Sequence, residues 1–369
     1  MTGASGEAVD VLLDALRIYS PTTQEEELAT FLAEKMGRLG YSKVRIDEAG
    51  NAVGEIGTGR TRLLLCGHMD TVPGKLPVVR KEGRIYGRGA ADAKSPLCAL
   101  LLAGAALADS GVRATFAGVT QEEGEGAGIE QLIRDGANYD YAIFGEPSGA
   151  NRITVGYRGR VSLYVTVKTP GGHAGSPWAQ RSAFDEFAHL LSRVKAYEKS
   201  KEVAGDHFRS LSISPTLVKA GIHHNVIPNL CEATLDLRLP PGMPSSKAVG
   251  EIRHVARQTD EGVEIDIRPG EPTEAYQADT GSRLVRAFQR AILLRLKTRP
   301  SLVRKTGTGD MNTFAHKKKA AECVTYGPGS SSTSHTDGEV VEVADYLNSI
   351  EVLKEAISQL VALSGSKAI

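Results

Sequence analysis

The sequence lacks the features that would point to a nucleic-acid-binding or membrane protein. Its 369 residues include 44 Lys and Arg and 44 Asp and Glu, so there is no net basic charge of the kind that attracts nucleic acid. No apolar run reaches the roughly 18 residues of a membrane span, and the first residues do not follow the basic-then-apolar order of a signal peptide. We therefore expect no nucleic-acid partner and no membrane insertion.

Cysteine is also scarce. The four thiols, Cys66, Cys98, Cys231 and Cys323, lie far apart and show no paired spacing typical of a zinc finger or a disulfide framework. This pattern indicates reduced, structural cysteines and a cytoplasmic protein. Cys66, two residues before His68, is a conceivable metal ligand, but its aliphatic surroundings favour a place in the core.

The chain is longer than the ~250–300 residues at which a single core usually stops growing, so we expect two domains. Predicted strands and helices alternate up to about residue 156 and again from Ser282, which is typical of an α/β fold. Between them the pattern becomes strand, helix, strand, strand, helix, strand, as in a ferredoxin-like unit. We therefore predict an α/β domain of residues 1–156 plus 275–369, interrupted by an α+β insert of residues 157–274.

Two local features are also predicted. Residues 225–239, in which Ala233, Leu235, Leu237 and Leu239 alternate with more polar neighbours, should form one continuous strand. Thr22 or Thr23, just before three glutamates, should cap the second helix of the chain.

The stretch LLLCGHMDTVP, residues 63–73, ends a short buried strand in two polar residues. His68 and Asp70 are two positions apart, so on an extended chain they share one face. Ligand sites of open α/β sheets lie at this carboxyl end of the strands. A histidine there can bind a metal while a carboxylate orients its ring, although a simple turn after a strand fits these two residues equally well.

Four further segments place acids or a histidine where a strand or a Gly-rich turn ends. They contribute Asp92, the neighbours Glu122 and Glu123, Glu146, and His335. Taken singly, these residues also fit a helix cap or a solvated loop. Adjacent carboxylates repel each other unless a cation lies between them, so the set favours a site for Zn²⁺ or a related ion. One shared carboxylate would allow two metals, and Glu122 or Glu123 would remain as a general base.

These segments together resemble those of a known family. The motifs GHMDTVP, GRGAADAK, TQEEGEG, GEPS and GPGSSSTSH resemble, in order and spacing, those of the di-zinc M20 aminoacylases and peptidases, over essentially the whole chain. The resemblance implies a zinc-peptidase-like catalytic domain, with a mixed sheet flanked by helices. It also implies that the ferredoxin-like insert is a dimerisation domain.

The resemblance assigns the site residues as well. It implies two Zn²⁺ per subunit, with Co²⁺ as a substitute, and a cis peptide bond between Asp92 and Ala93. The implied ligands are His68, Asp92 and Glu146 for one metal, and Asp92, Glu123 and His335 for the other. Asp70 would orient His68, and Glu122 would be the general base.

Other segments are expected to contact the substrate. His173, in TPGGHAG, resembles the histidine that reaches the partner subunit's site in a homodimer, where it would stabilise an oxyanion. Asn225, in NVIP, resembles a substrate-contacting asparagine, and Arg238 suits a bidentate carboxylate clamp. Gly309 and Asp310 lie in a Gly-rich loop expected near the substrate carboxylate. Many relatives carry Ser where this chain has Gly309.

The substrate is indicated by two motifs. KTGTGDMN and SHTDGE look most like the lysine-biosynthesis branch of the family. Members of that branch release lysine or ornithine from the C-terminal glutamate side chain of a small acidic amino-group carrier protein. The alternatives are an N-acetylornithine deacetylase, a succinyl-diaminopimelate desuccinylase, or an inactive M20-like binding protein, although the general base and every ligand are present. Steering of an acidic carrier would use Arg304, Lys305 and Lys317–Lys319.

Overall fold

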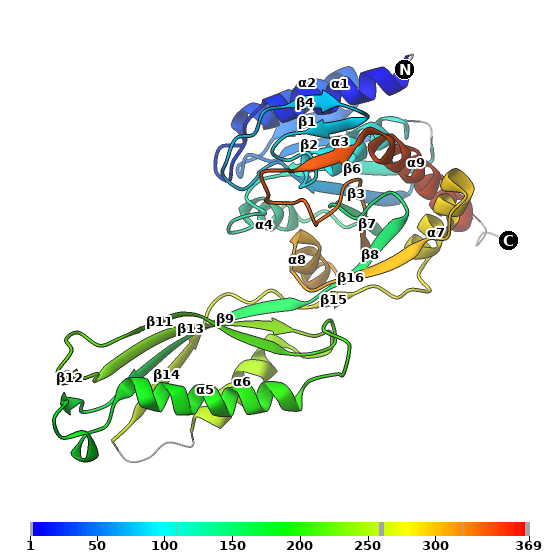
Figure 1. The fold of residues 1–369 in the computed structure, drawn as a ribbon. Helices are drawn as coiled ribbons and strands as arrows, with labels where there is room; N and C mark the ends of the chain where they lie inside the picture. The colour runs from blue at the N-terminus through cyan, green and yellow to red at the C-terminus, as the bar shows by residue number, and fades with distance from the viewer. Residues whose placement is uncertain (1–2, 109, 258–261, 320, 366–369) are drawn as a thin grey trace. The chain divides into compact units, whose positions relative to one another are not determined.

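The computed structural model describes residues 3–108, 110–257, 262–319 and 321–365, traced in Figure 1. The chain divides into two compact units. The first unit comprises Met1–Gly156, Ala278–Arg304 and Gly309–Ile369, and the second comprises Tyr157–Gln277 and Lys305–Thr308.

The first unit contains a mixed sheet in the order β1, β2, β6, β3, β7, β17, β8 (Figure 1). These strands are β1 Ser42–Ile46, β2 Ala52–Ile56, β6 Val112–Val119, β3 Thr61–His68, β7 Tyr141–Gly145, β17 Glu322–Thr325 and β8 Arg152–Tyr157. Strand β16, Ser301–Lys305, pairs with β8. A smaller sheet joins β18 Val340–Glu342, β5 Arg84–Tyr86 and β4 Val79–Lys81. The four strands β6, β3, β7 and β17 run parallel to one another, whereas β1, β2 and β8 pair antiparallel.

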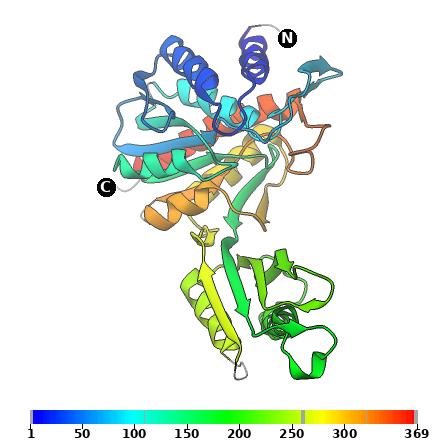
Figure 2. The same ribbon diagram turned by 90° about the vertical axis from the view of Figure 1, so that its left-hand side faces the viewer.

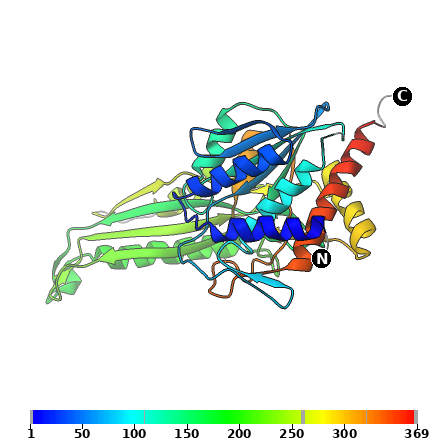
Figure 3. The same ribbon diagram turned by 90° about the horizontal axis from the view of Figure 1, so that it is seen from above.

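Helices cover both faces of this sheet, as predicted. They are α1 Ala4–Arg17, α2 Glu26–Arg38, α3 Lys94–Ala105, α4 Ala127–Arg134, α7 Arg283–Leu296, α8 Asp310–Lys317 and α9 Val343–Gly365. A Cβ atom on Gly145 would come within 2.8 Å of Leu100 of α3, so this helix packs directly on the backbone of β7. The preceding residue, Phe144, points to the opposite face and packs edge-on against Phe314 of α8. Figure 3 shows α1 beside α9, where the Tyr346 hydroxyl donates a hydrogen bond to the Ala8 carbonyl.

The register of the parallel strands brings their carboxyl ends to one edge. Gly67 lies opposite both Gly118 of β6 and Gly145 of β7, and Thr325 of β17 lies opposite Phe144. The residues that follow these strands therefore meet at the same edge of the sheet. They are His68 and Asp70, Glu122 and Glu123, Glu146, and the loop that carries His335.

The second unit is built on an antiparallel sheet in the order β11, β13, β9, β14, with helices α5 and α6 on one face (Figures 1 and 2). Its elements are β9 Gly159–Lys168, β10 Gly172–His173, the 3-10 turn Pro177–Ala179, α5 Ala183–Ser200, β11 Ser212–Ala220, β12 Val226–Ile227, β13 Leu230–Leu239, α6 Ser245–Ala256, β14 Glu264–Pro269 and β15 Tyr276–Gln277. In chain order this is the predicted ferredoxin-like β-α-β-β-α-β arrangement. The alternating Val161, Leu163, Val165 and Val167 of β9 face the helices and form the core.

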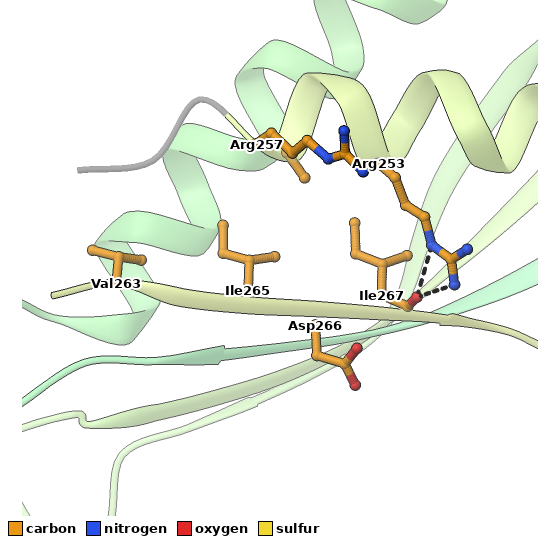
Figure 4. A pocket seen from close by; sticks show the side chains of 7 residues that line it. Arg253, Arg257, Val263, Ile265, Asp266 and Ile267 are labelled. Atoms are coloured by element: carbon orange, nitrogen blue, oxygen red, sulfur yellow. Dashed lines mark hydrogen bonds between the residues drawn. The ribbon is translucent and has the colours of Figure 1, made fainter. Parts of the chain in front are cut away.

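A groove of about 590 Å³ lies between α6 and the edge strand β14. Figure 4 shows Arg253 and Arg257 on the helix side and Val263, Ile265 and Ile267 on the strand side. The Arg253 guanidinium donates to the Ile267 carbonyl, so this arginine ties α6 to β14.

Two local predictions were wrong. Residues 225–239 do not form one strand: Pro228 has no N–H to donate, and it separates β12, which pairs with β10, from β13. Nor do Thr22 and Thr23 cap α2. The helix begins at Glu26, so its N-cap residue is Glu25, without a side-chain cap, and the Thr22 hydroxyl donates to Asp70.

All four cysteines are free and buried, and Cys66 lies in the core of β3 as the aliphatic context predicts. Among the described residues, no helix is both long enough and apolar enough to cross a membrane.

Candidate metal centre

His68 is the most deeply buried histidine of the site, with 2% of its side chain exposed. Its Nδ1 lies 2.9 Å from the Asp70 carbonyl oxygen and 3.4 Å from the Asp70 carboxylate. Both partners accept a hydrogen bond, so Nδ1 carries the proton and Nε2 is left as a metal ligand. The predicted orientation of His68 by Asp70 thus has a geometric basis, with the backbone carbonyl as the nearer partner.

Asp70 also holds the turn that carries the paired glutamates. Its two carboxylate oxygens accept the backbone N–H groups of Glu122 and Glu123, each at 3.0 Å. The preceding N–H, of Gln121, is donated to the buried Glu25. Gln121 adopts a left-handed φ of 59°, which turns three successive N–H groups toward these carboxylates. The side chains of Glu122 and Glu123 are therefore presented by a fixed backbone.

Asp92 lies between two histidines. Its Oδ1 is 3.3 Å from His68 Nε2, and its Oδ2 is 3.5 Å from His335 Nε2. Glu146 adds an oxygen 3.7 Å from His68 Nε2, and Glu123 adds one 2.6 Å from His335 Nε2. Each carboxylate oxygen of Asp92 thus lies beside a different histidine, and each histidine also has a glutamate beside it. The Asp92–Ala93 peptide bond is cis, as the resemblance implies.

The donor atoms fit a divalent ion by both distance and type. Ligand atoms ~2.1 Å from a tetrahedral ion lie ~3.4 Å from one another, close to most of the separations above. Ligand atoms of His68, Asp92 and Glu123 all lie within 4.8 Å of one another, as do those of His68, Glu122 and Glu146. Mixed imidazole and carboxylate ligands suit zinc and its neighbours.

The charges of the site also call for a cation. Burial, and then the charge of Glu146, raise the pKa of Glu122 well above its ordinary value. Burial raises the pKa of Glu123, and it raises that of Asp310 to about 8, with Glu146 adding to the latter shift. Burial opposes the charge on His68, but hydrogen bonds to Asp70 and Asp92 outweigh it and raise the pKa of His68. The buried carboxylates of the site therefore lack enough nearby positive charge to balance them.

Sequence reasoning missed a second ring of residues behind these side chains. Glu339 accepts the backbone N–H groups of Ala91 and Asp92 and pairs with Arg88, and Glu25 and Thr22 hold the Gln121 turn and Asp70. Glu339 and Arg88 lie inside the SHTDGE and GRGAADAK motifs. Only their position in those motifs could have drawn attention to them.

The residues expected to bind substrate fall into separate groups. Asp310, the first residue of α8, is close enough to His68 and Glu146 for their charges to shift its pKa, and Gly309 precedes it as the N-cap. His173 and Asn225 are brought together in the second unit, where the Ala174 N–H donates to the Asn225 carbonyl. Arg238 lies near the other end of β13 and pairs with Asp236 at 3.1 Å.

The fold and the site together define an α/β protein with a candidate metal-binding cluster of His and carboxylate side chains at the carboxyl edge of its sheet. The sequence model that describes peptidase family M20/M25/M40 matches residues 64–359 of this chain. This chain belongs to that family.

Named relatives extend over nearly the whole chain. A LysW-lysine/LysW-ornithine hydrolase of Sulfurisphaera tokodaii is 32% identical over 351 residues, 93% of this chain and 95% of the relative. A LysW-lysine hydrolase of Deinococcus radiodurans is 33% identical over 362 residues, 96% of this chain and 97% of the relative. A Pyrobaculum aerophilum protein, provisionally named for LysW-lysine/LysW-ornithine hydrolysis, is 36% identical over 356 residues, 95% of this chain and 97% of the relative.

Solved structures share the fold at lower identity. The aminopeptidase PepT of Bacillus cereus aligns with a TM-score of 0.82 at 20% identity, over 97% of this chain and 99% of that one. A Bacillus subtilis protein described as a dinuclear metal-binding peptidase of the M20 family aligns with a TM-score of 0.74 at 13% identity, over 98% of each chain. These similarities confirm the predicted zinc-peptidase-like fold.

Proposed function

We propose that this protein is a metal-dependent amide hydrolase that releases lysine or ornithine from an amino-group carrier protein, in cytoplasmic lysine and arginine biosynthesis. The relatives above, named for hydrolysis of LysW-lysine and LysW-ornithine, support this substrate class. So do the KTGTGDMN and SHTDGE motifs. The bond cleaved would be the amide between the amino acid and a glutamate side chain of the carrier.

The observation that carries the proposal is the position of Asp92, whose two oxygens face His68 and His335 separately. We assign His68, Asp92 and Glu146 to one zinc ion and Asp92, Glu123 and His335 to a second, with Co²⁺ as a substitute. A carboxylate shared in this way holds two cations close together despite their repulsion. When bound, the ions would polarise the amide carbonyl and acidify the attacking water.

Glu122 moves the protons in this proposal. Its carboxylate takes a proton from the attacking water and returns it to the departing amine nitrogen. Burial and Glu146 raise its pKa, which favours a group that can hold a proton between these two steps. Asp70 keeps the Glu122 backbone in place through the 3.0 Å hydrogen bond.

His173 is assigned to the oxyanion of a partner subunit in a homodimer. Its Nδ1 accepts the Gly175 N–H at 2.9 Å, which leaves Nε2–H as an outward donor. Support for dimerisation comes from β11, an edge strand of the second unit that exposes Leu217 and Val218. An exposed apolar edge strand pairs readily with a second chain. Asn225, Arg238, Gly309 and Asp310 remain assigned to substrate binding.

The test is a product assay on the zinc-loaded enzyme. It would compare carrier-linked lysine and carrier-linked ornithine with N-acetylornithine and succinyl-diaminopimelate, each with and without a chelator. We expect release of free lysine or ornithine from the carrier, lost on chelation and restored by Zn²⁺ or Co²⁺. Efficient hydrolysis of N-acetylornithine without action on the carrier adduct would replace the proposal with the deacetylase, and metal binding without any turnover would favour a binding protein.

A further inference from the structure

We propose that Glu339, supported by Arg88, is a positioning residue that sets Asp92 for metal binding without being a ligand itself. The inference rests on the proposed metal site. Only 1% of the Glu339 side chain and 6% of the Arg88 side chain are exposed. Neither residue belongs to the groups of metal-ligand atoms found among the described residues.

Both carboxylate oxygens of Glu339 are occupied. Oε1 accepts the N–H groups of Ala91 at 3.0 Å and Asp92 at 2.9 Å, and Oε2 accepts Arg88 Nη1 at 2.9 Å. The strand pairing explains why they meet. Because Val340 of β18 lies opposite Tyr86 of β5, Glu339 falls beside the turn that runs from Gly87 to Asp92.

Arg88 makes two further backbone contacts, one within the loop that carries Glu339 and one to a third loop. Its Nη1 also donates to the carbonyl of Thr336, the residue after His335, at 3.1 Å. Its Nε donates to the Gly74 carbonyl at 2.9 Å, in the loop that follows His68 and Asp70. One buried ion pair therefore connects the three loops that carry His68, Asp92 and His335.

The consequence for metal binding follows from the geometry of Asp92. Its oxygens lie 3.3 Å and 3.5 Å from two different histidines, so a small rotation of its backbone would disturb both contacts. Glu339 fixes that backbone through two N–H groups at once. Partners that orient metal ligands typically change metal affinity by ~10–100-fold when they are lost.

The experiment must separate positioning from simple support of the fold, because removing one member of a buried ion pair destabilises a protein by itself. Two double variants do this: Arg88→Met with Glu339→Gln, and Arg88→Met with Glu339→Leu. Both remove both charges. They differ in whether residue 339 retains an oxygen that can accept the Ala91 and Asp92 N–H groups.

The measurements are the dissociation constant for Zn²⁺, by competition with a chromophoric chelator, and the thermal midpoint of the metal-free protein. We expect the Leu double variant to bind zinc ~10–100-fold more weakly than the Gln double variant. Glu322→Gln is the control. Glu322 accepts the Leu284 N–H at the amino end of β17, away from the metal edge. Removing the charge of Glu322 should therefore leave zinc affinity unchanged.

Equal zinc affinity in the two double variants would overturn the inference while leaving the proposed function intact. Wild-type protein that binds no zinc would instead reject the proposed function, and this inference with it. If the Leu double variant does not fold, Glu339→Asp replaces it, because it keeps the charge but shortens the reach by one methylene. Unchanged zinc affinity in Glu339→Asp would equally overturn the proposal.

Discussion

Replacing Glu122 with Gln should remove turnover while leaving the metals bound. The turn that presents residue 122 is held by its backbone, through the N–H groups that Glu122 and Glu123 donate to Asp70. The substitution therefore leaves the turn in place. Gln has the same shape as Glu, but it cannot accept the proton of the attacking water.

The expected magnitude follows from this single loss. A general base contributes ~10²–10⁴-fold, and each tenfold is ~1.36 kcal/mol, so the barrier to hydrolysis should rise by about 3–5 kcal/mol. The KM for the carrier substrate should change little, since no assigned substrate contact is removed. Because burial and the charge of Glu146 oppose ionisation of Glu122, the metal-free variant should be at least as heat-stable as the metal-free wild type.

The assay is kcat and KM on the carrier-linked substrate, with zinc counted in the same samples. Glu125→Gln is a matched control, because Glu125 is an exposed residue of the same turn. A Glu122→Gln enzyme with nearly normal kcat would remove Glu122 from the role of general base. Loss of zinc in that variant would show instead that Glu122 is a ligand.

Four further predictions follow from the site. Asp92→Ala should lose both metals and unfold at the temperature of chelated wild type, and metal analysis showing two retained ions would exclude a bridging role. Mixing His173→Ala with Glu122→Gln protein should restore about a quarter of wild-type activity once subunits exchange, because one site of each heterodimer has both residues; no recovery after exchange would place His173 in its own subunit's site or in none. Neutralising Lys317–Lys319, of which Lys317 pairs with Glu130 at 2.6 Å, should raise the KM for carrier-linked lysine and leave the hydrolysis of small amides unchanged. Added salt should have the same effect. An unchanged KM in the variant would exclude this patch. Zinc binding should release protons and tighten as pH rises from 6 to 8, measured by calorimetry in buffers of different ionisation heat, since the pKa of Asp310 is raised to about 8.

The parts of the fold that were predictable have strong local signals. The apolar run Leu63–Leu65 before Gly67 predicts a buried strand. The alternation of Val161 to Val167 predicts a strand with one buried face. The strand expected over residues 225–239 was wrong at its start: the alternation from Ala233 to Leu239 lies in β13, but Pro228 separates this strand from β12. A hydrophobic pattern does not register that Pro228 lacks a backbone N–H, and the missing hydrogen-bond donor interrupts the strand.

The site shows the same division. Acids and histidines placed at strand ends could be recognised individually, and topology then determines that they meet, because parallel strands bring their carboxyl ends together. The second ring could not be recognised in this way. Glu339 and Asp92 are 247 positions apart, and their contact depends on the pairing of β18 with β5. Glu25 and Gln121 are likewise joined only in the folded chain.

A zero net charge conceals how unevenly this protein distributes its acids. Parallel strands β3, β6 and β7 direct His68, Glu122, Glu123 and Glu146 to one edge, and two buried carboxylates behind them, Asp70 and Glu339, use their charge on backbone N–H groups. Asp70 and Glu339 are satisfied by these N–H groups, Glu339 together with Arg88, whereas the carboxylates at the edge are not, and burial raises the pKa of Glu122 and Glu123. The fold thus separates acids that hold the backbone from acids that need a metal. The same separation explains why removing Glu339 should weaken metal binding even though it is not a ligand.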